Sequence, residues 1–87
     1  MSLPFIEKKI SNNVYVRLFS SELDSGELYW HQDHEDRLVE AVEETDWMVQ
    51  LDNQLPIKLE GEIFIPKGVY HRLIKGNNDL QIRLTKL

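Results

Sequence analysis

The fold is most constrained by residues 61–73 (GEIFIPKGVYHRL), where two short apolar segments meet at a forced reversal of the chain. The β-branched and aromatic residues at 63–65 favour a strand. Pro66 fixes φ and Gly68 allows a positive φ, so the tripeptide Pro66-Lys67-Gly68 predicts a tight turn. His71 follows at a defined distance from that turn. The stretch therefore predicts two strands, with a histidine at a fixed place on the second.

The rest of the chain repeats this alternation of short strands and polar turns. Clusters of Ser, Asn, Asp and Gly separate the apolar segments. Residues 76–79 (GNND) predict a hairpin before the last strand. About eight or nine short strands with such punctuation are typical of an all-β sandwich or barrel. Strands are predicted over residues 5–10, 14–19, 27–31, 47–51, 54–59, 63–65 and 80–87.

One segment, residues 34–46 (HEDRLVEAVEETD), fits two patterns. It contains strong helix formers, and Leu38 and Val42 are spaced as on one face of a helix. It also alternates as a strand does. The two sides of that strand would be Leu38, Glu40 and Val42 against Arg37, Val39 and Ala41. The pattern alone leaves helix and strand open.

Length and charge limit the possible functions. A chain of 87 residues predicts a single domain over residues 1–87. The net charge of −5 argues against a nucleic acid or an anionic membrane as partner. No apolar run is long enough to span a bilayer, and the N-terminus lacks a signal-peptide pattern, so we expect a cytoplasmic protein. Small molecules or another protein remain as partners.

The chain contains no cysteine, which excludes disulfides and thiolate ligands. Any metal ion must therefore be held by His, Asp or Glu. Histidines occur at positions 31, 34 and 71. His34 lies in a polar loop and is expected to be solvated. The acidic residues that follow it, Glu40, Glu43, Glu44 and Asp46, are expected to form a solvated face.

Residues 61–75 resemble the second sequence motif of the cupin family. That motif is a glycine, a few strand residues, Pro-x-Gly, two further residues and a metal-binding histidine. Gly61, the turn at 66–68 and His71 match it in this sequence. Lys75 stands where the family usually has an asparagine.

Residues 26–44 keep the spacing of the first cupin motif but not all of its residues. Counted from Gly26, the first histidine of the motif falls on His31 and the second on Asp33. Arg37 stands at the position of the glutamate ligand, and Glu44 at the closing glycine. The resemblance implies a cupin-type double-stranded β-helix, a jelly-roll-like barrel, in which residues 34–46 include a strand rather than a helix. It also implies a divalent metal ion, Fe, Mn, Zn or Ni.

The candidate metal ligands are His31, Asp33 and His71. Residues two apart on a strand share a face, so His31 and Asp33 point together if Gln32 is extended. Closure of a barrel would bring His71 to the same point. Two imidazoles and a carboxylate form the facial triad that suits non-haem Fe(II). The alternatives are a hydrogen-bonded strand residue for His31 and an Asx turn for Asp33.

Two arginines bear on the ligand. Arg37 cannot ligate a cation and repels one nearby, so it either weakens metal binding or binds an anionic ligand. His-x-Asp followed by a distant histidine also resembles the ligand pattern of the oxoglutarate-dependent oxygenases. In that reading Arg83 would bind a carboxylate.

Three functions therefore remain open: a metal-binding cupin-like protein whose barrel pocket takes a small anionic ligand, a metal-free small-molecule-binding module of the same fold, and a protein-interaction module. No catalytic pair or nucleophile identifies a reaction, so the sequence does not decide whether the protein is an enzyme. With Tyr29, His31, Arg37, Val39 and Ala41 facing inward, Trp30, Leu38 and Val42 turn outward. Such an apolar patch predicts a homodimer.

Overall fold

The computed structural model describes residues 3–87, and the fold there is all-β, as the sequence predicts. Among these residues, no helix is long and apolar enough to cross a membrane. The elements are β1 (Ile6–Ser11), β2 (Val14–Phe19), the 3-10 helix η1 (Ser25–Glu27), β3 (Arg37–Ala41), β4 (Met48–Leu51), β5 (Ile57–Lys58), β6 (Glu62–Ile65), β7 (His71–Ile74) and β8 (Leu80–Lys86).

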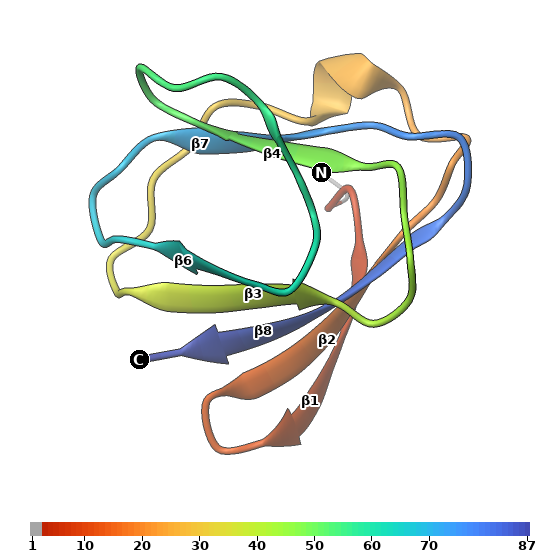
Figure 1. Ribbon diagram of the computed structural model, residues 1–87. Helices are drawn as coiled ribbons and strands as arrows, with labels where there is room; N and C mark the ends of the chain where they lie inside the picture. The colour runs from red at the N-terminus through yellow and green to blue at the C-terminus, as the bar shows by residue number, and fades with distance from the viewer. Residues whose placement is uncertain (1–2) are drawn as a thin grey trace.

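The strands form two antiparallel sheets that face each other (Figure 1). The larger sheet has five strands in the order β1-β2-β8-β3-β6, and the smaller has three in the order β5-β4-β7. From β3 onward the chain passes back and forth between the sheets, because β3, β6 and β8 belong to the larger sheet and β4, β5 and β7 to the smaller. This winding encloses the space between them.

The core fills that space with alternate residues of each strand. On β8 the buried side chains are Leu80, Ile82 and Leu84, two apart as the strand period requires. The alternation predicted for residues 47–51 is confirmed, with Trp47, Val49 and Leu51 all buried. A Leu or Val buried in this way contributes about 1.5–3 kcal/mol of transfer free energy.

The segment at residues 34–46 that fitted both helix and strand contains the strand β3 (Arg37–Ala41) and no helix. β3 lies between β8 and β6 in the larger sheet. Val39 at its centre is 5% exposed, whereas Val42 just beyond it is 47% exposed. The alternating pattern therefore described this strand correctly. Because β3 pairs with a strand on each edge, the sheet outweighs the helix propensity of its residues.

The strand predicted over residues 27–31 is wrong. Residues 25–27 form η1 instead, and the Asp24 side chain caps it by accepting a hydrogen bond from Gly26 N at 3.0 Å. Residues 28–30 belong to no strand, and His31 makes one isolated bridge with His71. The capping carboxylate turns the chain into this helix before a strand can form.

The hairpin predicted at residues 76–79 is also wrong. The residues do form a loop before β8, but β7 and β8 lie in different sheets. The loop is held by Asp46, whose carboxylate accepts hydrogen bonds from Asn77 N at 3.0 Å and Asn77 Nδ2 at 2.7 Å. Trp47 Nε1 donates to Asn78 O at 2.6 Å, so the crossover is fastened directly to the core.

The predicted turn at Pro66-Lys67-Gly68 is confirmed, and Gly68 has a φ of +79°. It connects β6 with β7 and so passes from one sheet to the other. Its amides also hold the loop before β3: Gly68 N donates to Asp33 O at 3.0 Å, and Lys67 N donates to Asp36 Oδ1 at 2.7 Å. The two motif-like segments of the sequence are thus joined by main-chain donors.

Candidate metal and ligand site

His31 and His71 form a hydrogen-bonded antiparallel pair. His31 N donates to His71 O at 3.0 Å, and His71 N donates to His31 O at 2.8 Å. Residues paired in this way project their side chains to the same face of the sheet. The ring centroids are accordingly 4.3 Å apart, with the ring planes inclined by 59°.

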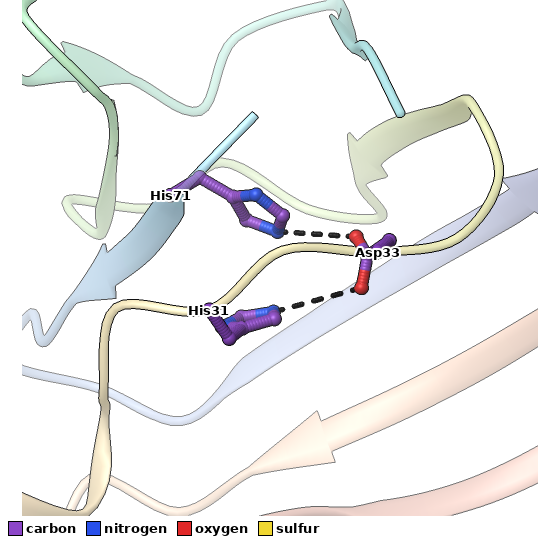
Figure 2. A group of neighbouring side chains, drawn as sticks. All are labelled: His31, Asp33 and His71. Carbon is purple, nitrogen blue, oxygen red and sulfur yellow. Dashed lines mark ion pairs between the residues drawn. The ribbon is translucent and has the colours of Figure 1, made fainter. Parts of the chain in front are cut away.

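Asp33 completes the group, and its carboxylate faces the Nε2 atoms of both rings (Figure 2). Its Oδ2 is 3.2 Å from His71 Nε2, and its Oδ1 is 3.9 Å from His31 Nε2. Each residue offers one possible ligand atom, and these three atoms all lie within 4.8 Å of one another. The three residues singled out in the sequence are therefore brought together. Asp33 arrives there from a loop, not from an extended strand.

The tautomers of both histidines follow from their backbone contacts. His31 Nδ1 lies 3.1 Å from Tyr29 O, and His71 Nδ1 lies 2.9 Å from Val69 O. A carbonyl oxygen only accepts, so each Nδ1 carries the hydrogen and each Nε2 presents its lone pair when the ring is neutral. Burial lowers the pKa of His71, and it outweighs the hydrogen bond to Val69 O and the Asp33 carboxylate, which both raise it.

The donors fit a cation. Asp33 Oδ2 is buried and makes no hydrogen bond within residues 3–87, and it faces His71 Nε2. Two lone-pair-bearing atoms at 3.2 Å repel unless a proton or a metal ion lies between them. A metal ion bound by both atoms would satisfy the carboxylate oxygen and the imidazole nitrogen together.

Arg37 lies beside the carboxylate and lines the same cavity, as its inward orientation predicts. Its Nη1 is 3.3 Å from Asp33 Oδ1, and its Nε donates to Glu35 Oε2 at 2.8 Å. The hydrogen bond from Arg37 lowers the pKa of the Glu35 carboxyl. One guanidinium therefore serves two carboxylates, which offsets its repulsion of a cation. It occupies Oδ1 of Asp33 and leaves Oδ2 facing His71.

The site opens into a cavity of about 550 Å³ between the sheets. Its walls are mainly apolar, and four of the polar groups are His31, Asp33, Arg37 and His71. A volume of this size is typical of small-molecule pockets. The apolar wall includes Phe5, Phe19, Leu28, Val39, Val49, Ile65, Leu73, Ile82 and Leu84.

Sequence reasoning missed two charged residues of this wall, Glu27 and Arg17. The signal was present in the pattern, because Arg17 is two residues from Phe19 on the same strand and shares its face. Phe19 is 4% exposed in the core. Assigning Phe19 to the core therefore already implied that the Arg17 side chain faces inward.

Other predicted residues lie away from the cavity. The oxygenase-like role of Arg83 is not supported, because its side chain is 59% exposed and lies 4.0 Å from Glu40. Ile82 and Leu84 take the inward positions of that strand. His34 is exposed, as predicted. Tyr29, predicted to face inward, is 71% exposed, although it contributes to the cavity lining.

Comparison with known proteins identifies the fold. No protein-family model matches the sequence, and no curated protein matches it. Solved structures do match. The chain is similar to an RmlC-like cupin family protein with a double-stranded β-helix fold from Methanocaldococcus jannaschii, with a TM-score of 0.70 and 15% identity over 98% of this chain and 81% of that one.

Two enzymes of known structure are also similar. A chain from the crystal structures of the DMSP lyases RdDddP and RnDddQII gives a TM-score of 0.69 and 21% identity over 85% of this chain. The present chain spans only 37% of that protein's length. The structure of Fe(II) HppE in complex with substrate gives a TM-score of 0.67 and 9% identity over 100% of this chain and 55% of that one. The likeness extends over both sheets, and the chain is therefore a small domain with the cupin-type double-stranded β-helix fold.

Proposed function

We propose that this domain binds a divalent transition-metal ion through His31 Nε2, Asp33 and His71 Nε2. The observation that carries the proposal is the buried Asp33 Oδ2, which makes no hydrogen bond within residues 3–87 and faces a histidine nitrogen at 3.2 Å. A bound cation would satisfy both atoms at once. The backbone carbonyls at Nδ1 fix the orientation of both rings, as carbonyl partners do in metal sites of proteins.

The donor set restricts the choice of metal. Two imidazoles and one carboxylate on one side of an ion suit Fe(II), Mn(II), Ni(II) or Zn(II), and they leave further positions for a ligand. When bound, such an ion polarises a ligand oxygen as a Lewis acid. The protein residues would position the ligand against it, with Asp33 and His71 buried and His31 half exposed beside a mainly apolar wall.

The charge of the loaded site favours a small anionic ligand. A divalent ion with Asp33 leaves one positive charge, and Arg37 is already paired with Glu35. A carboxylate or phosphate group would neutralise that charge, and the apolar wall would contact the rest of the molecule. The similar structure of HppE contains Fe(II) and a substrate, which supports the proposal of a metal ion and a small-molecule ligand for this domain.

Elemental analysis of the purified protein tests the metal proposal. We expect one equivalent of metal in the wild type and none in His71→Ala. His34→Ala is the matched control, because His34 is exposed and outside the site, and it should retain the metal. If the wild type binds no added Mn(II), Ni(II) or Zn(II), a metal-free binding module becomes the better interpretation. In that module Asp33 would be neutralised by its ion pair with Arg37 and not by a metal ion.

We also propose that two copies associate through the outer face of the larger sheet. Along one row of that face, Lys8 and Arg83 stand on β1 and β8, and Glu40 and Glu62 stand on β3 and β6. A two-fold axis would place the positive part of one copy against the negative part of the other. Phe64, which is 49% exposed and opposite Leu38, would be covered.

Sedimentation tests this association. We expect a dimer at micromolar concentration, and we expect Arg83→Glu to weaken it, since that change places like charges together. A monomeric wild type would refute the proposal. The cytoplasmic location stays a prediction from the sequence.

A further inference from the structure

We infer that Arg17 is a second anion-binding group of the cavity, and that the cavity accommodates an elongated small molecule with an acidic group at each end and an apolar middle. The inference deepens the proposed function and rests on it, because one acidic group is placed on the metal ion. The other is placed on the guanidinium of Arg17.

Arg17 faces the cavity rather than the solvent. On β2 it shares a face with Phe19, which is buried, whereas Leu18 between them is 45% exposed. Its partner on β8 is Ile82, which is 4% exposed. The Arg17 side chain is itself only 15% exposed and lines the same cavity as His31, Asp33 and His71.

The guanidinium of Arg17 retains hydrogen-bonding capacity. Its Nε donates to Glu7 Oε1 at 3.2 Å, and its plane lies over the Phe5 ring at 4.1 Å. Within residues 3–87, Nε is the one guanidinium nitrogen of Arg17 with a hydrogen bond. Its Nη groups can therefore bind a carboxylate in the paired geometry that arginine favours. Arg37 differs, because both Nε and Nη1 are already taken up by carboxylates.

Arg17 is well separated from the metal site. Arg17 and Arg37 stand on the two strands that flank β8, and their β8 partners, Ile82 and Lys86, are four residues apart. With strands about 4.8 Å apart and about 3.4 Å per residue, the two Cα atoms lie roughly 16–17 Å from each other. The arginine side chains and the metal ligands shorten the gap that a ligand spans. The wall in that gap includes Val39, Ile82 and Leu84, all apolar.

A purely structural role for Arg17 makes a different prediction. Glu7 and Arg17 are directly opposite each other on β1 and β2, so their ion pair also fastens an edge strand. If that were its whole role, changing either residue would alter stability and leave ligand selectivity unchanged. Ligand selectivity is therefore the deciding measurement.

The experiment uses the Ni(II)-loaded full chain and calorimetric titration with hexanoate and with dicarboxylates from glutarate to suberate. We expect at least one dicarboxylate to bind the wild type tenfold more tightly than hexanoate. In Arg17→Gln this advantage should fall to about twofold or less, with Ni(II) affinity unchanged. Arg72→Gln is the matched control, because it removes an arginine that is hydrogen bonded to Gln50 and does not line the cavity, and it should keep the advantage.

Glu7→Gln provides a second variant that does not depend on the folding of Arg17→Gln. It removes the carboxylate that competes for the guanidinium, so dicarboxylate affinity should rise severalfold, whereas a structural pair would give no gain. The inference is overturned if no dicarboxylate exceeds hexanoate in the wild type, or if the advantage survives in Arg17→Gln. Should the wild type bind no Ni(II), the proposed function fails and this inference fails with it. Normal Ni(II) binding without the advantage refutes the inference alone.

Discussion

Replacing Arg37 with glutamine should strengthen metal binding. Its Nη1 is 3.3 Å from Asp33 Oδ1, so its charge stands about 6 Å from an ion held on the far side of that carboxylate. At this separation, one charge repels a divalent ion by about 1.4 kcal/mol at the dielectric constant of water and about 5.5 kcal/mol at an effective value of 20. The cavity is open to solvent at one side and apolar at the other, so the effect lies between these limits.

Two neighbouring groups modify this magnitude in known directions. Glu35 loses the hydrogen bond that lowers its pKa, and its freed negative charge then adds to the attraction for the cation. Asp33 loses its partner at Oδ1, which costs free energy in the metal-free protein and is recovered when the ion binds. Both changes favour the loaded state. We therefore expect at least a tenfold gain in affinity, the equivalent of about 1.4 kcal/mol.

Calorimetric titration of Mn(II) and Zn(II) into the metal-free wild type and Arg37→Gln measures the gain. Arg37→Glu, which places a carboxylate at the position where cupins carry one, should exceed Arg37→Gln. Arg72→Gln is the control, because Arg72 is hydrogen bonded to Gln50 and stacked on Trp30, away from the metal ligands. Equal affinities for the wild type and both Arg37 variants would show that no ion binds beside Asp33, and the reasoning would be wrong.

Three further outcomes follow from the fold and the site. Leu84→Ala should lower the free energy of unfolding by about 2–5 kcal/mol in denaturant titration, because Leu84 is 2% exposed; a change below 1 kcal/mol would contradict its place in the core. Gly76→Ala should lower the thermal midpoint, because a Cβ there would collide with the side chain of Asp46, whereas Glu43→Ala in an exposed loop should not. The metal-free protein should lose stability as the pH falls below about 6.5. The pKa of His71 is lower in the folded state than in the unfolded state, so the unfolded state binds more protons. Above that pH, the contribution of His71 to the free energy of unfolding is fully present. A pH series of unfolding measurements should show this slope weakened in His71→Gln, and an unchanged slope would contradict the assignment.

Local sequence patterns predicted most of the strands correctly, because the formation of each of these strands depends mainly on residues that are close together in the sequence. The alternation at residues 47–51 and the turn at Pro66 and Gly68 both survive in the structure. The errors concern which strand or sheet a segment pairs with. The residues at 76–79 reverse the chain as their turn chemistry requires, but turn chemistry does not determine which sheet receives the next strand. At residues 27–31, the strand-like side chains had no continuous partner, so a single bridge formed.

The candidate site was likewise predicted correctly in some parts and wrongly in others. Motif spacing identified His31, Asp33 and His71, and the structure brings their side chains together. It failed for Arg83, which the alternation of Ile82 and Leu84 turns outward. The ion pair between Arg37 and Glu35 was invisible for another reason: side chains two residues apart meet there because the loop before β3 bends.

The bridge between His31 and His71 also bears on how the chain folds. The two residues are separated by 71 − 31 = 40 positions, and β3, β4, β5 and β6 lie between them. No local segment can assemble the three donors, because closing this long loop has to come first. An ion would therefore be captured late in folding, and would then act as a clip across the loop. Quenching of Trp30 or Trp47 fluorescence by a paramagnetic ion during refolding would report completion of the barrel rather than its beginning.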